Sequence, residues 1–243
     1  MYRVLASVLR PLFVVVTRPV WSGEENLPAE GGYIVAANHM SNVDPVTTAQ
    51  FLYVRGRAPK IMAKHSLWKV PVLGWFLRRT GMIPVERGSA GAAGSLVAAR
   101  EALAAGECVL IFPEGTLTRD PELWPMAAKS GVARLALASH APVVPVAHWG
   151  EQHVLPQHGW PRMRLRQPVQ VRAGTPVDLS DLRDRPLDAA ALATATRRIM
   201  DAVTAVLEEL RGEAAPAEHD PRRAARTRER GSAVPHHETE EDR

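Results

Sequence analysis

The chain lacks several features that would settle its class at once. Among its 243 residues there is one cysteine, Cys108, which excludes an internal disulfide framework and a cysteine-based zinc site. The N-terminal region has no long apolar run, because its longest unbroken stretch, residues 11–16, is far shorter than the roughly 18–20 residues that span a bilayer. No small-residue cleavage site follows that stretch, which argues against a secretory signal.

The residues that are present favour a folded domain with an uneven charge. Hydrophobic residues make up 46% of the chain and charged residues 23%, enough to bury a core. The net charge is +4, but residues 1–90 carry +6, residues 91–211 carry zero and residues 212–243 carry −2. The front third of the chain therefore favours an anionic partner, which could be a nucleic acid, a membrane surface or a phosphorylated substrate.

The first 22 residues have an amphipathic pattern. Apolar residues recur at helical spacing and arginines lie near them: Val4, Leu5, Val8, Leu9 and Leu12, with Arg3, Arg10 and Arg18. This pattern predicts a helical segment over residues 1–22 that contacts a membrane surface. An ordinary helix packed on the domain is the alternative.

Short apolar runs alternate with helical patterns along the rest of the chain. Buried strands are expected at 33–37, 109–112, 143–147 and 169–173, with a weaker one at 82–85, and helices at 45–52, 89–105, 126–139 and 186–211. We therefore expect an α/β fold: one domain over residues 23–211, with a mixed or mostly parallel sheet flanked by helices. Residues 212–243 are poor in large apolar side chains, which predicts a disordered tail.

A histidine and an aspartate directly follow the first of these strands. His39 stands five residues ahead of Asp44, so a turn between them would let the carboxylate fix the imidazole tautomer and support a proton on the ring. The carboxyl end of a strand is where α/β folds place their sites. A capping role at the following helix is the alternative for this pair.

Three later segments end or form strands. Arg87 follows the strand at 82–85, where it could bind a phosphate or simply be a surface residue. Glu114 and Gly115 form a Pro-Glu-Gly turn after the strand at 109–112, where Glu114 could orient a substrate hydroxyl or pair with Arg87. Pro145 lies inside the strand at 143–147, which predicts an edge strand or a bulge.

Taken together, these segments resemble the glycerophospholipid acyltransferase family, and specifically its bacterial 1-acylglycerol-3-phosphate acyltransferases. The resemblance covers roughly residues 20–180, and the blocks occur in family order. His39 and Asp44 match the His-Asp motif, residues 81–87 the second block, 112–116 the third and 144–146 the fourth. The family's third block continues with an arginine after the threonine, whereas here Leu117 stands there and Arg119 comes two residues late.

The resemblance implies an enzyme that moves an acyl group from acyl-CoA or acyl carrier protein to the sn-2 hydroxyl of lysophosphatidate. It implies His39 as general base and Asp44 as its partner, with Arg87 on the phosphate and Glu114, Gly115, Thr116 and Arg119 in substrate binding. Lys129 is another candidate cation, or simply a surface lysine. No metal and no bound cofactor are implied, and the expected location is the cytoplasmic face of the cell membrane, peripheral or monotopic.

Some alternatives stay open at this point. The acceptor could be another lysolipid, or the chain could be a non-catalytic lipid-binding module on the same fold. No helix-turn-helix, zinc-finger or aromatic RNA-binding pattern supports a nucleic-acid partner. Trp68, Trp75 and Phe76 could line an acyl-chain groove, dip into lipid or belong to the core. Cys108 is expected to be a small buried hydrophobe.

Overall fold

The computed structural model describes residues 11, 13–86, 89–157, 160 and 166–216. Its strands are β1 (Thr17–Ser22), β2 (Tyr33–Ala37), β3 (Pro59–Lys64), β4 (Ile83–Val85), β5 (Cys108–Ile111), β6 (Val143–Trp149) and β7 (Gln167–Ala173). Its helices are η1 (Glu24–Asn26), α2 (Asp44–Val54), η2 (His65–Lys69), α3 (Pro71–Arg79), α4 (Ser89–Ala104), α5 (Gly131–Ser139), η3 (Glu151–His153), α6 (Ser180–Arg183) and α7 (Ala189–Arg211).

The strands form one mixed sheet in the order β1-β7-β6-β2-β5-β3-β4. Neighbouring strands run parallel except β6 and β7, which pair antiparallel from Val146–Ala173 to Trp149–Gln170. The expected α/β fold with a mixed, mostly parallel sheet is confirmed. Both sheet faces are covered by helices, which explains why the central strands read as continuous apolar runs rather than as alternating ones.

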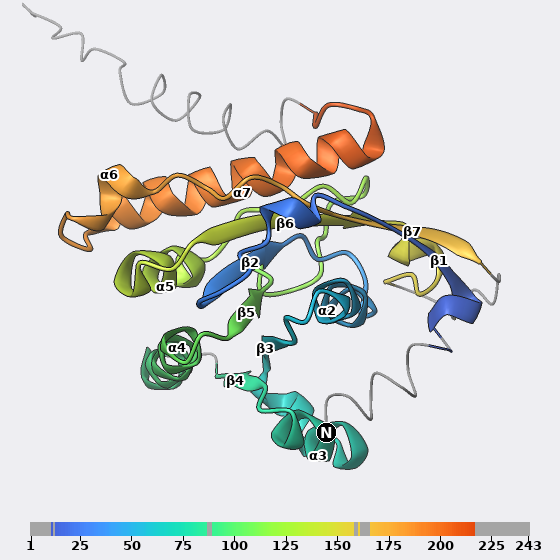
Figure 1. The fold of residues 1–243 in the computed structure, drawn as a ribbon, viewed down its shortest axis with the longest axis horizontal. Coiled ribbons are helices and arrows are strands. Elements are labelled where there is room, and N and C mark those ends of the chain that lie inside the picture. The colour runs from blue at the N-terminus through green and yellow to red at the C-terminus, as the bar shows by residue number, and fades with distance from the viewer. Residues whose placement is uncertain (1–10, 12, 87–88, 158–159, 161–165, 217–243) are drawn as a thin grey trace, which may run out of the picture.

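Alternate residues of the central strands face two separate cores. Ile34, Ala36 and Val143 pack against α4, α5, α6 and α7 on one face. Tyr33 and Val35 pack with Phe51 and Leu52 of α2 on the other. Figure 1 shows α7 lying along one side of the sheet and α2 on the opposite side. Cys108 starts β5 as a buried free thiol, as expected.

Several boundaries differ from those expected from the sequence. Residues 17–22, assigned above to the N-terminal segment, form β1, which pairs in parallel with β7. Residues 1–10 and 12 of that segment, and residues 217–243 of the tail, lie outside the described residues. Helix α5 begins at Gly131 rather than at 126, because the amide groups of Met126 and Lys129 bond to Glu114 and Pro113 instead of entering a helix.

The prediction that Pro145 marks an edge strand or a bulge is wrong. Strand β6 lies between β7 and β2, well inside the sheet. Pro145 is tolerated there because the β6–β7 ladder begins only at Val146, and the carbonyl of Pro145 accepts a hydrogen bond from Gly174 just beyond β7. The missing proline donor therefore removes no ladder hydrogen bond from β7.

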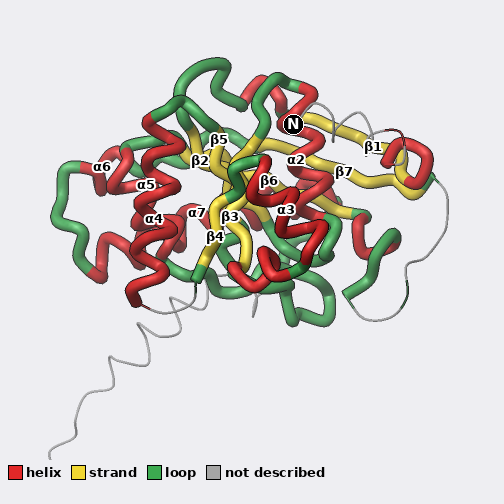
Figure 2. Tube along the Cα trace, turned by 90° about the horizontal axis from the view of Figure 1, so that it is seen from below, coloured by secondary structure: helices red, strands yellow, loops and turns green. Residues whose placement is uncertain are grey.

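Strand β3 and helix α3 are among the elements that were not expected from the sequence. Strand β3 links β5 to the short edge strand β4, and α3 follows β3 in the chain through η2. Figure 2, seen from below, shows α3 in front of the sheet. Among the described residues, no helix combines the length and the apolar character needed to cross a bilayer.

Candidate active site

The site gathers at the carboxyl ends of three neighbouring strands. His39 follows β2, Glu114 follows β5 and His148 stands near the end of β6. Because β2 is parallel to both β5 and β6, these ends meet at one edge of the sheet. Open α/β sheets place ligands at this edge. The topology thus brings together side chains that are far apart in the sequence.

His39 and Asp44 form the expected dyad. Nδ1 of His39 lies 2.9 Å from Oδ2 of Asp44, which also accepts the backbone N–H groups of Met40 at 2.6 Å and Ser41 at 2.7 Å. Asp44 is the first residue of α2, but its side chain accepts no hydrogen bond from an amide of that helix. The amides that donate to it belong to Met40 and Ser41, which precede the helix. The capping alternative is therefore wrong: Asp44 folds the loop back so that His39 reaches it.

The dyad leaves one imidazole nitrogen of His39 available. Oδ2 of Asp44 is an acceptor, so Nδ1 of His39 donates to it and Nε2 carries the lone pair. The Phe112 ring stacks on the imidazole at 4.3 Å between centroids and fixes its plane. The His39 side chain is 17% exposed while Asp44 is completely buried, and within the described part of the chain Nε2 makes no hydrogen bond. This is the geometry of a general base open to a substrate.

Glu114 joins the dyad loop to the loop before α5. Its Oε1 accepts the backbone N–H of His39 at 2.9 Å, and its Oε2 accepts that of Met126 at 3.0 Å. Burial raises the pKa of Glu114 to about 7, although these two hydrogen bonds pull it down. Both oxygens are thus engaged by the backbone, so Glu114 shapes the site from behind rather than facing open space.

The exposed part of the third block begins at Gly115, after the buried Pro113 and Glu114. Gly115 has φ +69°, in the left-handed region that glycine adopts without strain, and Thr116 beside it is also exposed. A Cβ at Gly115 would stand 3.3 Å from Nζ of Lys129, so this ammonium group lies over the turn. Arg119 is exposed a few residues later, with its backbone N–H on the Met126 sulfur.

The structure shows less of the remaining predicted residues. Arg87 lies outside the described residues, so its role and its pairing with Glu114 stay predictions. Trp75 is 48% exposed on α3 and does not belong to the core, whereas Trp68 and Phe76 are half-buried. Substrate contacts of Glu114, Gly115, Thr116 and Arg119 likewise stay predictions.

Sequence reasoning missed His148 and Glu151. Both side chains are completely buried, and His148 Nδ1 lies 3.4 Å from Oε2 of Glu151 and 3.8 Å from Oδ1 of Asp44. The sequence shows a histidine and a glutamate three residues apart at the end of an apolar strand, which is a weak signal among nine histidines. Donor atoms of Asp44, His148 and Glu151 lie within 4.8 Å of one another, close enough to share a proton or a small cation.

A comparison with family models decides the classification. Residues 18–149, more than half of the chain, match the model described as Acyltransferase. The chain belongs to the acyltransferase family. The matched range of this acyltransferase contains the dyad, Glu114 and His148.

Curated relatives of this acyltransferase carry one recurring name, 1-acyl-sn-glycerol-3-phosphate acyltransferase. The Bacillus subtilis protein is 31% identical over 150 residues, covering 62% of this chain and 72% of its own. The Borreliella burgdorferi protein is 32% identical over 142 residues, 58% of this chain and 55% of its own. The chloroplastic BAT2 protein of Brassica napus is 30% identical over 156 residues, 60% of this chain and 44% of its own. The chain thus spans about half to three quarters of these relatives.

A solved structure has the same fold. The crystal structure of the 1-acyl-sn-glycerophosphate (LPA) acyltransferase PlsC from Thermotoga maritima matches with a TM-score of 0.61 and 24% identity, over 82% of this chain and 75% of the other. This likeness supports the arrangement of the sheet and its helices, and the function is argued from the site.

Proposed function

We propose that this acyltransferase transfers a fatty acyl group from acyl-CoA or acyl carrier protein to the sn-2 hydroxyl of 1-acyl-glycerol-3-phosphate, giving phosphatidate. The observation that carries the proposal is the His39–Asp44 dyad, with Nε2 of His39 directed away from the carboxylate and free to accept a proton. The relatives' shared name supports the acceptor. A module that only bound lipid would have no chemical need for this buried carboxylate behind an available imidazole.

The proposed reaction needs one base and no covalent acyl-enzyme. Nε2 of His39 takes the proton of the acceptor hydroxyl as its oxygen attacks the thioester carbonyl. Asp44 stabilises the imidazolium that forms. The tetrahedral intermediate then expels the thiolate, which receives the proton from His39, so the dyad returns to its starting state. Neither a metal nor a bound cofactor takes part in this step.

The phosphate of the acceptor calls for a cation near the dyad. We expect Arg87→Ala to raise KM for lysophosphatidate by about 10-fold or more, because charge-assisted hydrogen bonds contribute about 1.5–3 kcal/mol. KM for acyl-CoA should change less than about twofold, since the donor does not use this contact. The measurement is thiol release from acyl-CoA with lysophosphatidate and, in parallel, with the phosphate-free monoacylglycerol.

Lys129→Ala is the matched comparison, because its ammonium group is the one that the structure places over the Gly115 turn. If Lys129→Ala rather than Arg87→Ala raises KM for lysophosphatidate, the role of Arg87 is wrong. If a lysolipid with another head group reacts faster than lysophosphatidate, that lysolipid is the acceptor. If no lysolipid gives thiol release, the chain is better described as a non-catalytic lipid-binding module.

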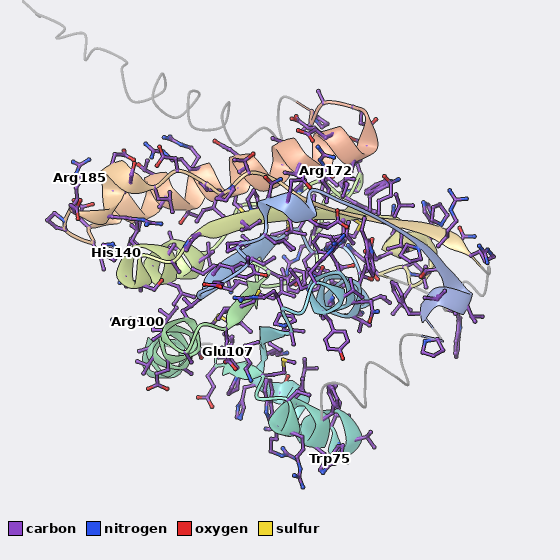
Figure 3. The ribbon with its side chains drawn as sticks, viewed as in Figure 1. Trp75, Arg100, Glu107, His140, Arg172 and Arg185 are labelled. Atoms are coloured by element: carbon purple, nitrogen blue, oxygen red, sulfur yellow. The ribbon has the colours of Figure 1, made fainter. Side chains whose placement is uncertain are left out.

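We infer that the enzyme works on an anionic membrane surface at the cytoplasmic face of the cell membrane. The inference is supported by η2 and α3, which follow β3 and so leave the sheet at the same edge as the His39 loop. Their exposed apolar side chains are Leu67, Val70, Val72, Leu73 and Trp75, and Val72 is 82% exposed. Figure 3 labels Trp75 on α3, at the opposite side of the molecule from α7.

The charge around this α3 surface matches an anionic bilayer. Between Asp44 and Glu86 the chain has seven Lys or Arg residues and no Asp or Glu. Four of these cations are exposed on or next to η2 and α3: Lys64, Lys69, Arg78 and Arg79. The Arg79 guanidinium lies 5.8 Å from the centre of the Trp75 ring. Apolar side chains among cations are typical of helices that lie in the headgroup region.

We expect the double variant Val72→Asp, Trp75→Asp to bind phosphatidylglycerol-containing vesicles at least about 10-fold more weakly. The variant loses apolar area that would enter the bilayer and adds like charge facing anionic lipid. Vesicle sedimentation measures the effect. Val97→Asp is the control, because Val97 is 54% exposed but lies on α4. Equal binding by both variants would place the membrane contact elsewhere.

A further inference from the structure

A second histidine, His148, is completely buried behind the dyad carboxylate. Oδ2 of Asp44 accepts three donors, whereas Oδ1 is buried with no hydrogen bond within the described part of the chain. Nδ1 of His148 lies 3.8 Å from Oδ1. The same Nδ1 lies 3.4 Å from Oε2 of Glu151. Asp44 is thus flanked by an imidazole on each side.

The hydrogen bonds of His148 fix how its protons must be placed. Nε2 of His148 lies 2.6 Å from the carbonyl oxygen of Asn38, so Nε2 carries a proton and donates it. A neutral ring would then present the bare lone pair of Nδ1 to two carboxyl oxygens. Three buried acceptors facing one another would be strongly unfavourable. A proton shared among Nδ1 of His148, Oδ1 of Asp44 and Oε2 of Glu151 removes this repulsion.

We propose that His148 is a positioning residue that holds this proton as an imidazolium, anchored by Glu151, and keeps the Asp44 carboxylate charged and oriented toward His39. The proposal rests on the proposed function, since it assigns a role in the same acyl transfer. His148 touches no substrate in this arrangement. It acts through Asp44, as the far member of a chain that runs Glu151, His148, Asp44, His39.

The electrostatics of the pocket support the imidazolium. Burial alone would lower the pKa of His148, but the charges of Asp44 and Glu151 raise it to about 9. Burial also raises the pKa of Glu151, although the charge of His148 pulls it down. We place the proton on His148, because a proton on Glu151 would leave the lone pair of His148 Nδ1 facing Oδ1 of Asp44. Asn38 fixes the ring further, because its amide group exchanges hydrogen bonds with the His148 backbone at 3.0 and 3.2 Å. The other titratable groups around the pocket are Glu114, which interacts electrostatically with Asp44 and His148, and His39, which stacks on the Phe112 ring.

The positive charge on His148 lowers the basicity of His39. A positive charge on the far side of Asp44 weakens the pull of Asp44 on a second proton at His39. Replacing His148 by a neutral residue should therefore make His39 more basic. The acidic limb of the pH profile of kcat/KM, which reports the base in the free enzyme, should then move to higher pH.

The test compares His148→Gln and Glu151→Gln in the full chain. Glutamine keeps a donor near Asp44 without the charge, and loss of Glu151 removes the anion that holds the proton on His148. We expect both variants to move the acidic limb upward by about half a pH unit or more and to lower kcat by about 10-fold. KM for lysophosphatidate should stay within about twofold. His140→Asn is the control, because His140 is an exposed histidine at the end of α5 and asparagine accepts its left-handed backbone conformation.

A merely structural role would lower thermal stability without moving the limb, and an unmoved limb in either folded variant would overturn the proposal. If neither variant folds, the protonation state of His148 can be measured by ¹⁵N NMR on the unmodified protein with ¹⁵N-labelled histidines. One ring should carry protons on both nitrogens at pH 8, and its absence would refute the imidazolium. A stoichiometric metal ion in the purified protein would also refute it. The NMR result stands even if no acyl transfer is found, which separates this proposal from the proposed function.

The same imidazolium should appear in the stability of the fold. The His148 pKa is raised from 6.5 to about 9, so the folded state holds a proton that the unfolded state releases between these values. This contribution is complete below pH 6.5 and is lost as the pH rises to about 9. The thermal midpoint of the unmodified protein should fall across that window, and the fall should be smaller in His148→Gln.

Discussion

His39→Ala should lower kcat by about 10²–10⁴-fold, the usual contribution of a positioned general base. The variant loses the imidazole whose Nε2 is available to take the proton of the acceptor hydroxyl. Thiol release from acyl-CoA in the presence of lysophosphatidate measures the effect. KM for both substrates should change little, because His39 acts on the proton rather than on the head group or the acyl chain.

The fold should survive this change. Asp44 keeps the two backbone donors Met40 and Ser41 when His39 is removed, so its buried charge does not lose all its partners. The backbone N–H of residue 39 also keeps its bond to Glu114. Circular dichroism and the thermal midpoint should match the parent, and His140→Asn, at the exposed end of α5, serves as the activity control. Full activity in a folded His39→Ala protein would end the assignment of the dyad.

Asp44 should show two effects that a pair of variants can separate. Asp44→Asn keeps an oxygen for the amides of Met40 and Ser41 but removes the charge that stabilises imidazolium at His39. A buried charged hydrogen bond contributes about 1.5–3 kcal/mol, which corresponds to about 10–150-fold in rate. Asp44→Ala should lose at least as much activity. It should also lose about 1–3 kcal/mol of stability for each buried amide that it leaves unpaired.

Measuring both the rate and the urea unfolding of the two variants separates the role of the Asp44 charge from its role as a backbone acceptor. The two variants should be similarly inactive, while only Asp44→Ala unfolds at a clearly lower urea concentration. If Asp44→Asn were as active as the parent, the carboxylate would be a loop-forming residue and the charge would play no part in the reaction. Equal stability of the two variants would contradict the role of Oδ2 as a backbone acceptor.

The parts of the molecule that follow local rules could be predicted from the sequence. Strands β2, β5 and β6 are buried on both faces, so their residues form short apolar runs that are visible without a structure. The dyad could be predicted because His39 and Asp44 are neighbours in sequence and one turn joins them. Helix α7 ends at Gly212, which has φ 69° as a helix stop of this kind requires.

Other parts depend on contacts that the sequence does not show. His148 stands 104 residues after Asp44, and only the parallel pairing of β2 with β6 brings the two together. The two oxygens of Glu114 hold the backbone of His39 and Met126, which lie 75 and 12 residues away in the sequence, so these bonds could not be predicted. Helix α3 buries only Gly74 and Leu77, so its pattern lacks the wide apolar stripe by which a core helix is recognised.

The parallel pairing of β1 with β7 affects how this enzyme can be shortened. An obvious way to obtain a version without the amphipathic N-terminal segment is to start the chain at residue 23. That cut would also remove β1, residues Thr17–Ser22, and expose the backbone edge of β7 along its full length. A bare edge strand is a template for pairing with other chains, so the truncated protein would be prone to aggregate. A cut ahead of Thr17 separates the segment from the sheet and keeps that edge covered.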